Sequence, residues 1–137
     1  MRKTAYTAAP TSLIMMARQD SLYEVKARVV GAIANPKRLE ILDLLADGER
    51  TVSELSVLLE LAQATTSQHL SVMRRAGVVS ARRQGNFVIY RVSDPRISTA
   101  CRAMSDAVVS ILTTEQERLR PALGLPNRHR SATEVRT

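Results

Sequence analysis

The short stretch SQHLSVMRRAGVV, residues 67–79, places a histidine close to two adjacent arginines. A metal site on one helix face needs a second ligand three or four residues away. Those positions after His69 hold Val72 and Met73, which cannot bind a metal ion in this way. Nucleophilic catalysis needs a partner such as a thiol, but the single cysteine, Cys101, lies far along the chain. We therefore interpret His69 as part of a surface that faces an external partner, with a half-buried packing role as the alternative.

The charge around this stretch has one sign. No Asp or Glu occurs from Leu61 through Ser93, and the formal net charge of the whole chain is +7. Solvated helix faces usually mix acids and bases, so this window favours a polyanionic partner, although charge alone does not separate nucleic acid from a membrane surface. The arginines of the window are Arg74, Arg75, Arg82, Arg83 and Arg91.

Composition narrows the class of protein. Hydrophobic residues make up 45% of the chain and aromatic residues 3%, so the core has to be mostly aliphatic, which suits a helical protein. No apolar run is long enough to span a membrane, residues 4–12 are too polar for a signal peptide, and one cysteine fits a reducing cytosol. Paired carboxylates, a phosphate-binding glycine loop and a nucleophile–base pair are also missing from the sequence. We expect a cytoplasmic protein that is not an enzyme, holds no cofactor or metal and has no membrane partner.

Hydrophobic periodicity predicts three helices ahead of the basic window. The first covers about residues 22–33, the second starts directly after Asn35, its cap, and the third covers roughly residues 51–60. Thr51 and Glu54 form a capping box at the start of the third helix. The residues predicted to be buried are Leu39, Leu42 and Leu45 of the second helix and Leu55, Leu58 and Leu59 of the third.

A fourth helix follows after a short break at residues 61–64. The pattern from Thr65 to Gln68 suggests another capping box, so this helix is expected to start at Thr65 or Thr66 and to end before Gly77. Two helices joined by so short a turn form a helix-turn-helix.

Two β-rich segments, residues 78–83 and 87–92, come next. They flank Gln84-Gly85-Asn86, a turn sequence of the kind that hairpins need. A last helix starts at Asp94-Pro95. The fold class is therefore mainly α with a small β-hairpin, a winged helix-turn-helix. We divide the chain into a flexible arm at residues 1–20, the winged-helix domain at residues 21–112 and a partly disordered extension at residues 113–137.

The fourth helix is the element that would enter the major groove of DNA. Its exposed side chains are short and polar enough to bond base edges, whereas arginines at its end and in the hairpin suit backbone phosphates. One of Thr65 and Thr66 is expected to serve only as a helix cap, and an ion pair within the protein is the alternative for Arg75. The predicted DNA-binding residues are Gln63, Thr65, Thr66, Ser67, Gln68, His69, Ser71, Arg74, Arg75, Arg82, Arg83, Gln84 and Asn86.

Residues 22–112 resemble the ArsR/SmtB family of bacterial winged-helix repressors. The similarity is carried by AIANPKRLEILDLLADGERTVSEL, by ATTSQHLSVMRRAGVVSARRQGNFVIYRV and by the DPR that opens the last helix. The resemblance implies a homodimer, formed through the first and last helices, that binds double-stranded DNA at an inverted-repeat operator. Each apolar stripe could equally be core within one chain. The residues expected at the dimer interface are Leu22, Val25, Val29, Ile97, Cys101, Met104, Val108 and Ile111.

The sequence departs from this family where its members sense metals. In the stretch ELSVLLEL, Ser56 and Leu58 occupy the positions of the two thiolates of the family's metal site. In the last helix, Asp94 is followed by Arg96 rather than a histidine, and Ala107 and Ser110 stand where a histidine and an acid are expected. A metal site is therefore not expected.

The role of Cys101 has two interpretations. It lies on the apolar stripe of the last helix and suits core packing, but near a dimer axis it could act as a sensor, with Arg102 favouring its thiolate. The main hypothesis is a homodimeric repressor released by an unidentified effector, a small molecule or a thiol-reactive species. The alternative is a winged-helix module that binds DNA or protein independently of any ligand.

Overall fold

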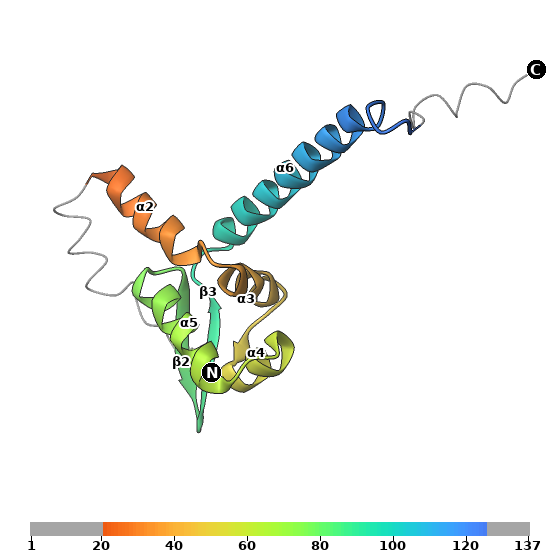
Figure 1. Ribbon diagram of the computed structural model, residues 1–137. Coiled ribbons are helices and arrows are strands. Elements are labelled where there is room, and N and C mark those ends of the chain that lie inside the picture. Colours follow the sequence, from red (N-terminus) through yellow and green to blue (C-terminus); the bar gives the residue numbers. More distant parts are fainter. Residues whose placement is uncertain (1–20, 126–137) are drawn as a thin grey trace, which may run out of the picture. The chain divides into compact units, whose positions relative to one another are not determined.

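The computed structural model describes residues 21–125, so the arm expected at residues 1–20 and the last part of the expected extension lie outside the described residues. The described residues divide into two compact units, with the boundary between Thr99 and Ala100. The elements, labelled in Figure 1, are α2 (Leu22–Ile33), α3 (Pro36–Ala46), β1 (Arg50–Thr51), α4 (Val52–Leu59), α5 (Gln63–Arg75), β2 (Val79–Gln84), β3 (Phe87–Val92) and α6 (Pro95–Leu119).

The first helices start where the capping residues predict. The side chain of Asn35 accepts from two backbone N–H groups at the start of α3, and Pro36 occupies the first helical position, where its missing N–H costs nothing. Thr51 and Glu54 form the expected capping box at α4, and Ser21 and Glu24 form a further one at α2.

The start of α5 differs from the prediction. The helix begins at Gln63, its N-cap is Ala62 without a side-chain bond, and the Thr65–Gln68 capping box is not formed. The reason lies in the turn between the two helices, because Glu60 ends α4 in the left-handed conformation, with φ 55°. That turn reverses the chain at once, and the hydroxyl of Thr66 donates instead to the Ala62 carbonyl at 3.1 Å.

The core of the first unit is built from one line of side chains on each helix and from the inner face of the hairpin. Leu39 and Leu58, which we expected to be buried, are 43% and 49% exposed. Both lie outside the line of side chains that packs inward. Leu59 is buried as predicted, and Ile41, which was not predicted, is also buried. The buried apolar residues are Ala32, Ile41, Leu42, Leu45, Leu55, Leu59, Leu70, Met73, Val78, Val79 and Ala81.

The hairpin is confirmed, and it belongs to a sheet with one more strand than the sequence predicts. The antiparallel sheet has the order β1-β3-β2, with Arg50 opposite Tyr90 and Gln84 opposite Phe87. The short β1 precedes α4 and has no alternating pattern long enough to reveal it. At the hairpin turn, Gly85 has φ +60°, a conformation that glycine adopts without strain.

The last helix starts as predicted and continues beyond its expected end at residue 112. Asp94 precedes it and accepts from the backbone N–H of Arg96 at 2.9 Å. The helix runs to Leu119 because Glu115, Gln116 and Glu117 are good helix formers, although they break the apolar periodicity on which the expected end rested. Among the residues that the structure describes, no helix combines the length and apolar character that crossing a membrane requires.

Candidate nucleic-acid interface

Helix α5 has one face committed to the core and one facing outward. Thr66, Leu70 and Met73 are fully buried, and they recur at the spacing of one helix face. The side chains of Thr65, Ser67, Gln68 and Ser71 are exposed on the other side. The polar, outward face is therefore held in place by the packing of its opposite face.

The residues predicted to bind DNA differ in their exposure and in their hydrogen bonds. Thr66 is buried, so its predicted contact with DNA is wrong; its hydroxyl serves the helix backbone. His69 is half-buried beside the exposed set. Gln63 is exposed, and its amide donates to the Ser53 hydroxyl at 2.9 Å, which ties the start of α5 to α4.

The two arginines that end α5 are exposed. Arg74 and Arg75 lie in the last turn, where a cation is favoured by the negative end of the helix dipole. Arg75 makes no ion pair with another described residue, so the alternative of an intramolecular pair has no support in the part of the chain that the structure covers.

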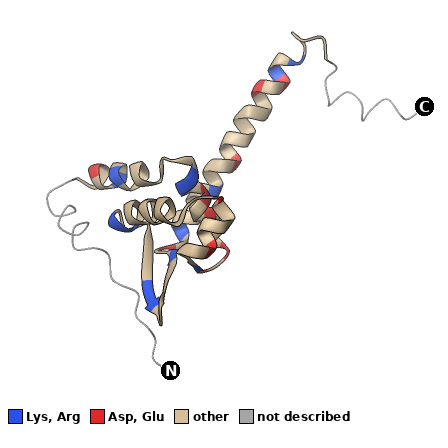
Figure 2. Ribbon diagram, turned by 60° about the horizontal axis from the view of Figure 1, so that its bottom comes forward, with Lys and Arg blue, Asp and Glu red and all other residues tan. Residues whose placement is uncertain are grey.

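The arginines of the hairpin have different environments. The side chain of Arg82 is 18% exposed, and it pairs with Glu49 at 2.7 Å and donates to Gln84 at 2.6 Å. Arg83 is exposed near the tip. Figure 2 shows basic residues along the hairpin toward its tip. Arg82 thus braces the hairpin against the segment before β1 and holds Gln84, while Arg83 faces solvent.

One end of α5 and the tip of the hairpin lie at the same end of the first unit (Figure 1). In Figure 1 the N-terminal end of α5 and the tip of the β2–β3 hairpin both lie at the lower end of this unit. A helix N-terminus presents unpaired backbone N–H groups, which attract phosphate. The polar start of α5 and the hairpin tip therefore lie at the same end of the unit and suit a polyanion, whereas Arg74 and Arg75 lie at the other end of α5.

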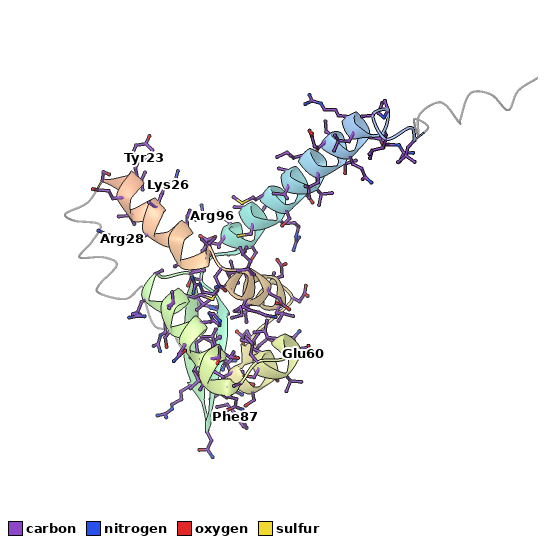
Figure 3. The ribbon with its side chains drawn as sticks, viewed as in Figure 1. Tyr23, Lys26, Arg28, Glu60, Phe87 and Arg96 are labelled. Carbon is purple, nitrogen blue, oxygen red and sulfur yellow. The ribbon has the colours of Figure 1, made fainter. Side chains whose placement is uncertain are left out.

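Sequence reasoning missed one exposed residue at this surface. Phe87 follows the hairpin turn and is 63% exposed, and Figure 3 shows it at the end of the hairpin. It is the single phenylalanine of the chain. An aromatic residue directly after the turn sequence Gln84-Gly85-Asn86 is the signal that could have identified it.

The positions of the family's metal ligands are occupied by other interactions. Ser56 is buried, and its hydroxyl donates to the Val52 carbonyl at 2.7 Å. The Asp94 carboxylate accepts from the Arg96 guanidinium at 2.6 Å, and this hydrogen bond is the main cause that lowers the pKa of Asp94 from 3.8 to about 2. Within residues 21–125, no group of three or more His, Cys, Asp or Glu side chains is arranged to hold a metal ion.

The residues expected at a dimer interface are largely open to solvent in the single chain. In α2, Leu22 is exposed and Val25 and Val29 are half-buried. In α6, Met104 is 66% exposed, and Val108 and Ile111 are also exposed. Ile97 and Cys101 are half-buried. Apolar surface of this extent on a helix is typical of an interaction face.

A helix-turn-helix followed by a basic hairpin defines the winged-helix class, whose second helix enters the major groove of DNA. The family model described as bacterial regulatory protein, arsR family, matches residues 35–81. The chain is 39% identical over 95 residues to the HTH-type transcriptional regulator Rv0081 of Mycobacterium tuberculosis, an alignment that spans 69% of this chain and 83% of that one. The chain therefore belongs to the ArsR family of bacterial regulatory proteins.

Solved structures agree with this assignment. The crystal structure of Rv0081 superposes with a TM-score of 0.64 at 37% identity and covers 70% of this chain and 97% of that one. The homodimeric winged helix-turn-helix DNA-binding domain Mb0332 of Mycobacterium bovis gives a TM-score of 0.58 at 34% identity, over 76% and 90% of the two chains.

A further relative by sequence is the transcriptional activator HlyU of Vibrio cholerae, which is 47% identical over 73 residues, 53% of this chain and 64% of that protein.

Proposed function

We propose that this chain is a sequence-specific DNA-binding transcriptional regulator that acts as a homodimer on an inverted-repeat operator. The observation that carries the proposal is the two-sided α5. Its buried face fixes the helix, and its exposed face offers small polar side chains in a window without acids. A surface of this kind can approach base edges without repelling phosphate.

The exposed residues divide into two roles. Thr65, Ser67, Gln68 and Ser71 are placed to bond base edges, with His69 beside them, and a glutamine can bond adenine through two hydrogen bonds. Phosphate binding is assigned to the exposed arginines and to the hairpin tip: Arg74, Arg75, Arg83, Gln84 and Asn86. Arg82 acts mainly by holding the hairpin, because its guanidinium is engaged by Glu49 and Gln84.

A homodimer would place two copies of α5 about a two-fold axis, which matches an inverted repeat. The exposed apolar side chains of α2 and α6 support this assembly, and the related domain of Mycobacterium bovis is homodimeric. A DNA-binding regulator shares a compartment with its DNA, so we place the protein in the cytoplasm.

We propose repression as the direction of regulation, in keeping with the repressors that the sequence resembles. One relative is named an activator, so direction needs its own measurement. A reporter fused to the bound promoter should rise in activity when the gene for this protein is deleted. A fall in activity on deletion would instead assign activation.

Binding itself is tested by fluorescence anisotropy with the DNA upstream of the protein's own gene and with random DNA of the same length. We expect the upstream DNA to bind at least about a hundredfold more tightly than random DNA, and both affinities to fall steeply with salt. Absence of binding to any promoter fragment at low salt would contradict the proposal.

We propose that a small molecule or a thiol-reactive species is the effector that releases the protein from its operator. The ligand-independent alternative is favoured by one observation, namely that Ser56 and Asp94 are engaged within the chain at the metal-ligand positions. A thermal-shift panel of metals and metabolites separates the two. A compound that raises the melting temperature and lowers operator affinity supports release by an effector, because ligand and operator then bind different states.

A further inference from the structure

We propose that Phe87 inserts into the minor groove beside each operator half-site, where it unstacks a base step, bends the DNA and adds sequence preference. This inference rests on the proposed function and extends it to a residue outside the predicted recognition set. It concerns the apolar tip of the hairpin and not its charges.

The register of the hairpin places Phe87 on the outer face of the sheet. Cross-strand pairs put Phe87 opposite Gln84 and Ile89 opposite Arg82, so these residues share one face of the β2–β3 ladder. The other face carries Val79 and Ala81, which are buried in the core. Phe87 therefore has no role in that core, and its ring is 63% exposed.

The surroundings of the ring indicate what covers it. Phe87 lies in the window from Leu61 through Ser93 that contains arginines and no acids. Arg83, one pair away from the tip, is exposed on the opposite face of the ladder, and Asn86 is exposed in the turn. On the face of the ring, Arg82 is paired with Glu49, so this acid is neutralised. A protein partner would not require this bias, whereas the phosphates that border a minor groove do. Charge complementarity thus favours DNA as the occupant.

An ion pair holds the strand next to the ring. Arg82 of β2 pairs with Glu49 in the segment before β1, and it also donates to Gln84 of the same strand, the residue opposite Phe87. Apolar side chains held in this way enter the minor groove between base steps and kink the duplex. The deformation is easiest at flexible pyrimidine–purine steps such as TA, which gives preference without base hydrogen bonds.

The experiment compares the full-length protein with Phe87→Ala and Phe87→Leu on an operator carrying TA steps beside each half-site, and on the same operator with AA steps there. Affinity is measured by anisotropy over a range of salt, and bending by energy transfer between dyes at the two DNA ends. Val57→Ala is the control, because Val57 is also apolar and is 77% exposed but lies on α4 between Glu54 and Glu60.

We expect Phe87→Ala to bind the TA operator about tenfold more weakly, in line with the energy of stacking on one aromatic ring. It should also lose the end-to-end shortening and the preference for TA over AA, while the salt slope stays unchanged because no charge is removed. Phe87→Leu should keep part of the bend, and Val57→Ala should match the wild type.

Two results would overturn the inference and are distinguishable. If the wild type binds and bends its operator and Phe87→Ala does the same, the wedge is excluded while the proposed function stands. If the wild type binds no DNA, the proposed function fails and the wedge fails with it.

Discussion

Exposed residues of the proposed DNA-binding surface differ in charge and in the element that carries them. Gln68 and Arg83 are both exposed, but one is a neutral side chain on the recognition helix and the other is a cation on the hairpin. The first can distinguish bases, and the second can bind any phosphate. Their substitutions should therefore differ in kind.

We expect Gln68→Ala to weaken operator binding by about tenfold and to leave random-DNA binding nearly unchanged, because a lost base contact costs ~1–3 kcal/mol at one site only. Arg83→Ala should weaken binding to both DNAs alike and flatten the salt slope by about one. Anisotropy titrations at several salt concentrations check both. Equal loss on operator and random DNA for Gln68→Ala would refute its role in reading bases.

Thr66 illustrates a residue whose type suits DNA but whose position does not. Its hydroxyl is buried and donates to the Ala62 carbonyl, which also accepts the backbone N–H of Thr66 at 3.0 Å. Thr66→Val keeps the shape and removes one redundant bond, so we expect unchanged operator affinity and a change of about 1 kcal/mol or less in unfolding free energy. Urea denaturation and anisotropy measure the two; a tenfold loss of operator affinity in a folded variant would contradict the buried role.

Cys101 is half-buried on α6, and core packing remains our interpretation. We expect Cys101→Ser to bind the operator as tightly as the wild type under reducing conditions, because serine is nearly isosteric and the residue lies outside the proposed DNA surface. Loss of operator affinity in that variant under those conditions would contradict the packing interpretation. The same titration after mild oxidation, with the serine variant as control, tests the sensor role.

At the scale of elements, the junction between α4 and α5 depends on one strained residue. Glu60 adopts φ 55°, which costs a side chain roughly 1 kcal/mol relative to a right-handed conformation. Hydrogen bonds offset this cost, because the Glu60 and Leu61 backbone N–H groups then donate to carbonyls at the end of α4. The short turn that results sets where α5 begins.

Glu60→Gly should therefore raise the free energy of unfolding, by about 0.5–1 kcal/mol after the greater flexibility of glycine in the unfolded chain is subtracted. Urea denaturation gives the difference. Glu60→Ala is the control, because alanine keeps the left-handed strain and should give no gain. Equal stabilisation by both substitutions would show that loss of the charge, and not relief of strain, is responsible.

At the scale of the whole molecule, the proposed homodimer would account for the apolar side chains of α6 that are exposed in one chain. We expect Val108→Asp to shift the protein toward monomer, because a charge placed in an apolar interface loses its hydration without gaining a partner. Sedimentation velocity measures the assembly, and operator affinity should fall at least about tenfold as the two linked half-sites become independent. Asp106→Asn, a change of one exposed residue on the same helix, tests whether any substitution on α6 has this effect.

If Val108→Asp stays dimeric with full operator affinity, α6 does not form the interface. If it becomes monomeric and still binds the operator as tightly, the interface is real but the inverted-repeat model is wrong.

The sequence alone determined the order of the helices and of the hairpin, and it predicted the surface that we propose faces DNA. Caps at Asn35 and Thr51, the glycine of the hairpin turn and the apolar periodicities act over a few residues, so their consequences can be worked out locally. The absence of acids from Leu61 through Ser93 is equally visible without coordinates, and it indicated the polyanionic partner.

Tertiary packing decided which face of each element is buried, and that depends on residues distant in sequence. It buried Thr66 beneath the recognition surface, left Leu39 and Leu58 half exposed and paired Arg82 with Glu49 across 33 positions of the chain. It also added β1 through pairing with β3 and turned Phe87 outward through the register of the hairpin. Local pattern identifies a side chain's chemistry, but its neighbours in space decide whether that chemistry serves the core or reaches a partner.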